Sequence, residues 1–345
     1  MTPSTGGDYR AFYRGRRVMI TGGLGFIGST VAHHLVELGA RVLIVDSLIP
    51  EYGGNLFNIE GIQDRVHVNI ADVRQQSTMN YLVRDQDVIF NLAGQVSHID
   101  SMQDPYTDLE INCRSQLFIL EACRRHNQGV KVVFAGTRQV YGRAARLPVT
   151  EEHLVNPVDV NGINKAAGEY YHLLYNNVLG VRACSLRLTN VYGPRQLIKH
   201  NRQGFIAWFI RLAIEDRDIQ VYGDGSQRRD FVYVDDAADA FLRAGASDAC
   251  NGGVFNVGGL EAIAHRDLVE RLIAVAGTGR FRFVDWPPEK KAIDIGDFYA
   301  DSSRIAETLG WRPVTPLGDG LARTVAFYRA HMPRYVPAAE APAVL

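Results

Sequence analysis

The chain has 345 residues, with 37 Lys+Arg against 38 Asp+Glu and 46% hydrophobic residues, which is ordinary globular composition. This composition excludes a disordered chain and a collagen-like fibre, and the net charge of −1 argues against nucleic acid as the main ligand. The four cysteines share no metal-ligand spacing, so we expect no metal site, buried free thiols and a cytoplasmic location. No segment is typical of a secretory signal or of a membrane-spanning helix.

Short β-branched runs alternate with longer helical patterns over the first 190 residues. The runs predict strands at residues 17–20, 41–45, 66–70, 87–90, 131–134 and 183–188. Helical patterns lie between them at residues 26–38, 105–126 and 164–178. Continuous apolar strands separated by helices are typical of a parallel sheet covered on both faces. The sequence therefore predicts an α/β fold, a doubly wound parallel sheet of Rossmann type.

The pattern changes beyond residue 190, where loops and short strands separate helical patterns at residues 205–215, 234–244 and 265–276. We interpret residues 15–190 as the Rossmann domain, with further elements returning from about 230–260, and residues 191–335 mainly as a smaller α/β substrate-binding part. The ends are rich in Gly, Ser, Thr, Pro and Ala, which predicts a flexible N-terminus at residues 1–14 and a flexible tail at residues 336–345.

A glycine-rich segment, TGGLGFIG at residues 21–28, directly follows the first predicted strand and opens the first predicted helix. In this context Gly22 permits a tight turn, Gly25 lets the backbone approach a pyrophosphate, and Gly28 allows the helix to pack on the strand. Asp46 ends the second strand, 18 residues after Gly28 (46 − 28), where a carboxylate accepts from the adenosine ribose hydroxyls and repels a 2′-phosphate. The sequence therefore predicts NAD as the cofactor.

Further cofactor contacts are expected from the start of the first helix and from the loops after the third and fourth strands, because ligands of such folds bind at the carboxyl edge of the sheet. Each of these loops, taken alone, also reads as a plain strand-end loop. The residues expected to line the cofactor in this way are Phe26, Ile27, Asp72, Val73, Leu92 and Ala93.

Taken together, many separate segments resemble one family. They are the glycine loop, Asp46 and residues 72–74, 91–97, 104–105, 137–142, 186–194 and 223–236. The chain is similar to the extended short-chain dehydrogenase/reductases, specifically the nucleotide-sugar epimerase/dehydratase family, over residues 15–330. The resemblance implies a tightly held NAD that takes a hydride from a sugar carbon, usually C4, and returns it after epimerisation, elimination or decarboxylation.

The resemblance also implies catalytic residues. Thr137 matches the hydroxyl residue that hydrogen-bonds the reacting sugar oxygen. Lys165 matches the lysine that binds the nicotinamide ribose and lowers the pKa of a catalytic tyrosine. That tyrosine is replaced by Asn161, and the neighbouring Gly162 keeps the register. An amide does not ionise near neutral pH, so Asn161 cannot take a proton, although it can orient a substrate oxygen.

Three explanations of this replacement stay open. Another group acts as the base, with Tyr141, His98 and Lys165 as candidates; the reaction needs no such base; or the protein binds NAD and a nucleotide sugar without turnover. The leading hypothesis is an NAD-dependent epimerase with a nonstandard acid/base group.

A second departure follows Thr137. Similar 4,6-dehydratases read Thr-Asp-Glu and similar decarboxylases carry a glutamate at the third position, whereas this chain has Arg138 and Gln139. A 4,6-dehydratase and a decarboxylase are both less favoured as functions, because the carboxylates that carry out these reactions are missing. Arg138 could bind a sugar carboxylate, as in a decarboxylase or dehydrogenase of a uronic nucleotide sugar, or it could turn to the surface.

The resemblance implies a nucleoside-diphosphate sugar as ligand and a homodimer formed through a four-helix interface of residues 105–126 and 164–178. A bidentate guanidinium is the usual partner of a diphosphate. The residues expected to bind this sugar nucleotide are Ser97, Arg138, Asn190, Arg229 and Lys291. The apolar residues available to the interface, which core packing explains equally well, are Leu117, Leu120, Tyr171, Leu174 and Tyr175.

Overall fold

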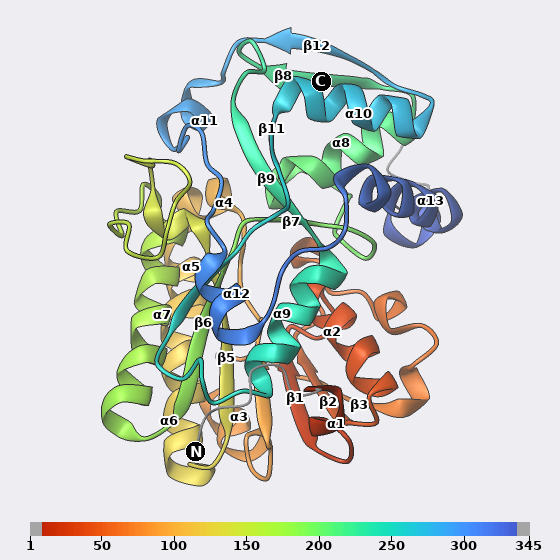
Figure 1. Cartoon of the computed structure of the whole chain (residues 1–345). Helices are drawn as coiled ribbons and strands as arrows, with labels where there is room; N and C mark the ends of the chain where they lie inside the picture. The colour runs from red at the N-terminus through yellow and green to blue at the C-terminus, as the bar shows by residue number, and fades with distance from the viewer. Residues whose placement is uncertain (1–8, 337–345) are drawn as a thin grey trace.

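The computed structural model describes residues 9–336, and its central element is a sheet of seven parallel strands (Figure 1). The strand order is β10-β6-β5-β4-β1-β2-β3, with a reversal between β1 and β4. Its strands are β1 (Arg17–Thr21), β2 (Arg41–Asp46), β3 (Val66–Ile70), β4 (Val88–Asn91), β5 (Lys131–Thr137), β6 (Arg182–Leu188) and β10 (Val254–Val257). This is the predicted doubly wound sheet of Rossmann type.

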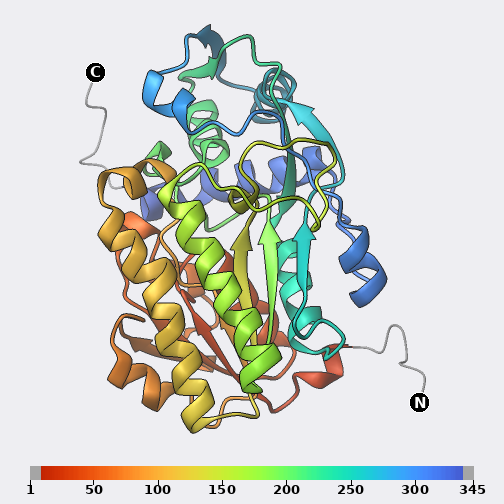
Figure 2. The same cartoon turned by 90° about the vertical axis from the view of Figure 1, so that its left-hand side faces the viewer.

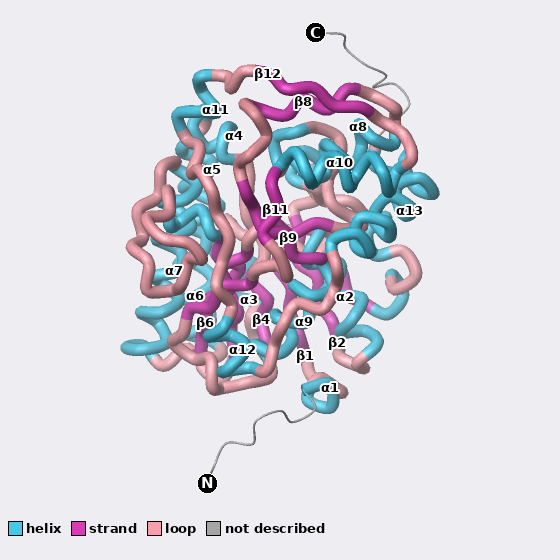
Figure 3. Tube along the Cα trace, turned by 45° about the horizontal axis from the view of Figure 1, so that its top comes forward, coloured by secondary structure: helices cyan, strands magenta, loops and turns pink. Residues whose placement is uncertain are grey.

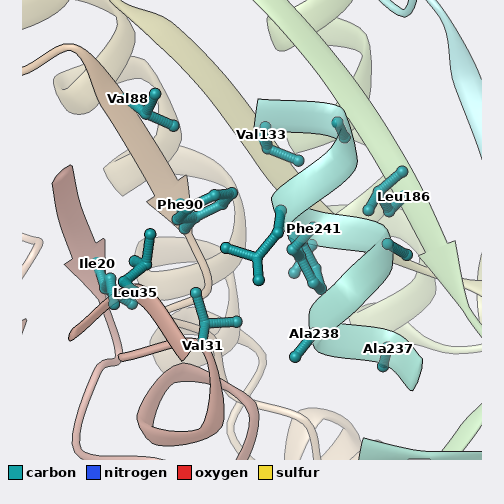
Figure 4. Close-up of a cluster of buried hydrophobic side chains, with 14 of the residues drawn as sticks. Ile20, Val31, Leu35, Val88, Phe90, Val133, Leu186, Ala237, Ala238 and Phe241 are labelled. Carbon is teal, nitrogen blue, oxygen red and sulfur yellow. The ribbon is translucent and has the colours of Figure 1, made fainter. Parts of the chain in front are cut away.

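Helices cover both faces of this sheet. On one face α2 (Phe26–Glu37) and α9 (Val234–Gly245) pack together, and on the other lie α3 (Gln76–Leu82), α6 (Ser115–His126) and α7 (Val160–Leu179). Figure 4 shows buried side chains of β4, α2 and α9, among them Phe90, Leu35 and Phe241, pointing toward one another. The continuous apolar strands are explained by this double cover.

Two helical segments differ from their sequence-based bounds. The helix expected at residues 105–126 is divided into α5 (Pro105–Leu109), a π-helical turn (Glu110–Arg114) and α6. The helix α7 begins at Val160, four residues early, because the Asp159 side chain accepts from Gly162 N and caps it. The helices α6 and α7 lie side by side on an outer face of the molecule (Figure 2).

The second part of the chain lies over the carboxyl ends of the central strands. A three-stranded sheet contains β7 (Asn190–Tyr192), β9 (Arg228–Tyr233) and β11 (Ala262–Ala264), and β8 (Asp218–Tyr222) pairs with β12 (Arg280–Val284). Figure 3 shows β8 and β12 at one end of the molecule, with β9 and β11 between them and the central sheet. The helices of this part are α8 (Phe205–Ile214), α10 (His265–Ala276), α11 (Pro288–Ala292) and α13 (Leu317–Tyr335), and all but the short α11 contribute to a second apolar core.

The remaining elements are short. The helices are α1 (Tyr9–Phe12), α4 (His98–Gln103) and α12 (Ser303–Leu309). Short 3-10 turns lie at Pro50–Tyr52, Leu56–Ile59, Gln63–Arg65, Arg138–Tyr141 and Asn201–Gln203. Between residues 9 and 336, none of the helices is both long enough and apolar enough to cross a membrane.

The strand β10 lies within the residues, about 230–260, from which further elements were expected to return to the Rossmann domain, and it joins the central sheet next to β6. Its four residues carry too little pattern to be predicted as a strand. One expectation about the chain ends needs adjustment. Residues 9–14 are not loose, because α1 is followed by the fully buried Tyr13, whose hydroxyl donates to Leu242 O at 2.6 Å. The rest of the predicted flexible ends, residues 1–8 and 337–345, lies outside the described residues.

Candidate active site

A large cavity of about 1010 Å³ runs along the carboxyl ends of the central strands and reaches into the second part of the chain. Its volume lies at the upper limit of the roughly 300–1,000 Å³ that small-molecule pockets occupy. It opens where the strand order reverses, between β1 and β4, which is where ligands of open α/β sheets bind. The cavity therefore has room for a dinucleotide and a second ligand beside it.

The glycine loop forms one wall of the cavity. Gly22 has φ +70, and a Cβ there would lie 2.9 Å from Ala93 N; a Cβ on Gly28 would lie 2.2 Å from Gly22 O. The helix α2 starts at Phe26 after Gly25, which has no side chain to cap the first N–H groups. These donors remain available to a phosphate, and the helix dipole favours its charge.

The predicted ribose-binding carboxylate also lines the cavity. Asp46 Oδ2 accepts from Leu24 N at 2.9 Å and Oδ1 accepts from Leu48 N at 2.8 Å, so the side chain is fixed against the glycine loop. Burial raises the pKa of Asp46 above its usual value. Each carboxylate oxygen keeps a second lone pair for a ribose hydroxyl. With the uncapped helix, this acceptor fits an NAD molecule.

The other predicted cofactor residues, Phe26, Ile27, Asp72, Val73, Leu92 and Ala93, line the same cavity. Asp72 is paired with Arg74, whose Nη2 donates to its Oδ2 at 2.6 Å. Burial alone would raise the pKa of Asp72, but its bonds with Arg74 hold it below the usual value. Arg74 lines the cavity too, although the sequence analysis, which included residues 72–74 in the family resemblance, assigned it no role.

Lys165 and Thr137 lie on this cavity, as the resemblance implies. Thr137 ends β5 and its Oγ1 accepts from Gln139 N at 3.2 Å. Lys165 is buried, donates to Ala135 O at 2.8 Å and lies over the Phe134 ring. Burial lowers the pKa of Lys165 to about 8.

Asn161, which stands where a tyrosine was expected, is 2% exposed and belongs to a buried polar network. Its Nδ2 donates to Gln95 O at 2.8 Å and to Asp108 Oδ2 at 3.0 Å. Asp108 also accepts from Asn112 and Asn164, so three amides surround one buried carboxylate. The amino group of Asn161 is thus already hydrogen-bonded within the protein, although the residue borders the cavity.

The three candidate bases are placed differently. His98 and Lys165 line the cavity, whereas Tyr141 does not. Tyr141 is 1% exposed, donates to Asn256 Oδ1 at 2.7 Å and stacks on Phe298. The side chain of Tyr141 points away from the cavity into the protein, and its burial raises the pKa to about 12. This position does not support the hypothesis that Tyr141 takes a proton from a ligand.

The expected diphosphate side of the cavity contains Arg138, Asn190 and Arg229. Arg138 donates through Nη2 to Asn190 Oδ1 at 3.0 Å. Arg229 donates to Gln227 Oε1 at 3.1 Å and leaves its buried Nε without a partner. Burial lowers the pKa of Arg229 to about 9, with Arg138 contributing in the same direction. The buried Arg229 and the half-buried Arg138 therefore both border the cavity.

Two predicted substrate residues lie elsewhere. Ser97 is fully buried, and its Oγ accepts from Asp100 N as the N-cap of α4. Lys291 does not line the cavity; its Nζ lies over Trp286, and the neighbouring Lys290 borders the cavity instead. A one-residue shift on a short helix turns a side chain by about 100°.

Sequence reasoning missed many cavity residues in the second part of the chain, among them Trp286, His265 and Lys290. His265 begins α10, and its buried Nε2 has no hydrogen-bond partner. No local motif marks these positions, because which residues of this part meet the cavity depends on how its elements pack over the central sheet.

Comparison with known proteins gives a consistent result. Residues 18–258 match the model of the "NAD dependent epimerase/dehydratase family". A UDP-glucose 4-epimerase of Mycolicibacterium smegmatis is 34% identical, with 91% of this chain and 98% of that protein covered.

Solved structures agree with this. The UDP-glucose 4-epimerase of Thermus thermophilus, in complex with NAD, superposes with a TM-score of 0.82 at 30% identity, covering 91% of this chain and 99% of that one. The UDP-N-acetylglucosamine 4-epimerase of Methanobrevibacter ruminantium, in complex with UDP-N-acetylmuramic acid, superposes with a TM-score of 0.85 at 28% identity, covering 92% and 100%. The chain is an NAD-dependent enzyme and belongs to the NAD dependent epimerase/dehydratase family.

Proposed function

We propose that the chain is a nucleotide-sugar 4-epimerase. This proposal rests on the continuous cavity. Gly22 and Asp46, which are expected to bind the dinucleotide, line the same cavity as the guanidiniums of Arg138 and Arg229, and Lys165 lines it too. NAD, when bound, supplies the hydride acceptor. Relatives named UDP-glucose 4-epimerase, 34% and 35% identical, support the same activity.

The side chains after Thr137 favour epimerisation over the other reactions of the family. Gln139 donates through Nε2 to Asp159 Oδ2 at 2.7 Å, and Arg138 donates to Asn190, so neither provides an acid at this edge of the cavity. Elimination and decarboxylation in similar enzymes use a carboxylic acid there. Epimerisation needs no such acid, because it consists of oxidation at the sugar carbon, with loss of the hydroxyl proton to a base, and return of the hydride to the opposite face.

The test is incubation of the purified enzyme with UDP-, GDP-, CDP- and dTDP-sugars, followed by chromatography and NMR of the products. We expect the C4 epimer to accumulate to equilibrium without net reduction of NAD. Deuterium at C4 of the substrate is expected to be retained in the product. A 4-keto-6-deoxy product, release of carbon dioxide or stoichiometric NADH would contradict epimerisation.

A second candidate concerns the sugar: Arg138 favours a uronic acid. Burial lowers the pKa of its guanidinium, and within residues 9–336 no carboxylate lies within 4.0 Å of it. The carboxylates that affect it from farther away are those of Asp159, Asp230 and Asp294. Removing one member of a buried ion pair costs about 3–5 kcal/mol, because the other charge is left without its partner. Among the described residues, Arg138 has an amide partner but no carboxylate beside it, so its position favours an anionic ligand. Arg229 already lies beside a carboxylate, with its Nη2 3.5 Å from Asp294 Oδ1, and only its Nε lacks a partner. Arg138 is therefore the guanidinium that we assign to a carboxylate at C6.

The uronate hypothesis is tested with Arg138→Met. We expect kcat/KM for UDP-glucuronate to fall at least 100-fold while the value for UDP-glucose changes less than 3-fold, because charge-assisted bonds to a desolvated carboxylate are lost. The exposed Arg143→Met is the control, and it should change neither value. An equal loss for both sugars would assign Arg138 to the diphosphate.

We also propose that the enzyme forms a homodimer through α5, α6 and α7. Four apolar residues of α7 are exposed by 48% to 68%: Ile163, Tyr170, Leu174 and Val178. Tyr106 of α5, a helix that packs against α7, is 78% exposed. Of the contacts expected from sequence, Leu120 and Tyr175 instead belong to the core, and Leu117 and Tyr171 pack partly against it. A second copy of this face is the partner that would cover the exposed stripe.

The four cysteines, all within the described residues, are free thiols, which supports a reducing cytoplasmic location. Cell fractionation tests this location, and recovery of the protein outside the cytoplasm would contradict it.

A further inference from the structure

We propose that His98, oriented by Asp159, takes the proton from the reacting sugar hydroxyl in place of the missing tyrosine. The inference rests on the proposed epimerase function and names the catalytic group that this function requires. The two residues are far apart in the sequence, and the fold brings them together at the edge of the cavity.

The imidazole of His98 has two distinct edges. Its Nδ1 lies 3.0 Å from Asp159 Oδ2, close enough for an ion pair but outside the angle of a hydrogen bond. Its other ring nitrogen has no hydrogen-bond partner among residues 9–336, and the side chain lines the cavity with 35% exposure. One nitrogen therefore approaches a carboxylate while the other is available to a ligand.

Asp159 is placed to remain charged and fixed. Its side chain is fully buried, its Oδ1 accepts from Gly162 N at 2.6 Å and its Oδ2 accepts from Gln139 Nε2 at 2.7 Å. Burial by itself would raise the pKa of Asp159, but His98 and Gly162 N hold it below the usual value. A rigid carboxylate beside Nδ1 selects the tautomer in which the proton is on Nδ1 and Nε2 is the free base.

The pair is connected to the catalytic end of β5. Thr137 Oγ1 accepts from Gln139 N at 3.2 Å, and the side chain of the same glutamine donates to Asp159. A chain of contacts thus runs from Thr137, which the family resemblance assigns to the sugar oxygen, through Gln139 and Asp159 to His98. These contacts connect His98 to Thr137, and both residues line the same cavity.

The other candidates are less suited. Tyr141 lies outside the cavity, and the amino group of Asn161 is bound to Gln95 and Asp108. Lys165 is the remaining rival, but it donates to Ala135 O and is needed at the cofactor ribose.

The sugar O4–H bond breaks and its proton goes to His98 Nε2, the C4–H hydride goes to NAD, and the C4–O bond becomes a carbonyl. On return the hydride is added to the other face of C4, and the imidazolium gives its proton back to O4. No further oxidant, reductant or co-reactant is required.

The deciding variant is His98→Ala, which leaves space for added imidazole. We expect kcat to fall at least 100-fold, within the 10²–10⁴-fold range of general acid–base catalysis, with NAD content and KM changed less than 3-fold. Added imidazole is expected to restore activity at least 10-fold in a saturable manner. His153→Ala, whose side chain accepts from Ala145 N away from the cavity, is the matched control and should neither lose activity nor respond to imidazole.

Asp159 is tested as a positioning residue with Asp159→Asn, which keeps an oxygen to cap α7. We expect kcat to fall about 10-fold and the imidazole rescue to weaken when this change is combined with His98→Ala. His98→Gln gives a second measurement should the alanine variant lose its fold, and it should show the same loss of kcat with normal NAD content.

The outcomes are separable. Wild-type turnover together with His98 variants that keep kcat within 3-fold would overturn the assignment of His98 and leave the epimerase function standing. A loss of kcat that imidazole does not restore, and that Lys165→Ala reproduces with rescue by added amines, would transfer the role to Lys165. Absence of wild-type turnover across the sugar panel would overturn both proposals.

Discussion

Removal of the Asn161 amide is predicted to destabilise the fold, because this side chain serves a buried carboxylate. In Asn161→Ala, the Asp108 carboxylate loses one of its three amide donors and Gln95 O loses its bond of 2.8 Å. A hydrogen bond to a charged group contributes about 1.5–3 kcal/mol and a neutral one about 0.5–1.5 kcal/mol. The free energy of unfolding should therefore fall by about 2–4 kcal/mol.

The same reasoning predicts a coupling between Asn161 and Asp108. In an Asp108→Asn background the carboxylate charge is gone, so Asn161→Ala should cost about 1–2 kcal/mol less than in the wild type. Asn177→Ala is the matched control, since this asparagine lies exposed on the same helix and its loss should stay within about 0.5 kcal/mol.

The assay is urea unfolding of NAD-free protein, because bound NAD would add its own stabilisation. The free energies of unfolding of the two single variants, the double variant and the control are compared at constant slope m. A cost below about 0.5 kcal/mol for Asn161→Ala, or an equal cost in both backgrounds, would refute the account of Asn161 as a ligand of the Asp108 carboxylate.

Gly28→Ala, whose Cβ would lie 2.2 Å from Gly22 O, should reduce NAD affinity more than 10-fold in titration calorimetry, whereas Gly129→Ala, with open space around it, should not; equal affinities would contradict the loop geometry. Burial lowers the pKa of Lys165 from 10.5 to about 8, so the folded protein loses this proton at a lower pH than the unfolded chain does. The free-energy cost of burying the charged amine is fully present below pH 8 and disappears as the pH rises toward 10.5. The NAD-free wild type should therefore gain stability over Lys165→Met across that range, by up to about 3 kcal/mol, and a flat difference in urea unfolding would refute the shift. Leu174→Glu should convert the dimer to a monomer in light scattering while Val314→Glu leaves it intact, and a monomeric wild type would exclude the interface.

Much of the cofactor site was accessible from the sequence because its signals are local. The turn at Gly22, the helix that starts after Gly25 and the carboxylate of Asp46 lie within a βαβ unit whose spacing is set by the chain itself. Lys165 and Thr137 were likewise identified by motif, and both lie on the cavity. Lys291, which was expected to bind the ligand, does not border the cavity, whereas Lys290 does, since no local rule states which face of a short helix meets the cavity.

The strand–helix alternation, the parallel sheet, the family and the expectation of a tyrosine at position 161 could all be read from the sequence, because each follows from patterns within a few tens of residues. The surroundings of position 161 could not. Only folding shows that Tyr141 points into the protein, that Asn161 is held by Asp108, and that Asp159 approaches His98. The physical reason is that the direction and partners of a side chain depend on contacts between segments distant in the sequence, which no local periodicity encodes.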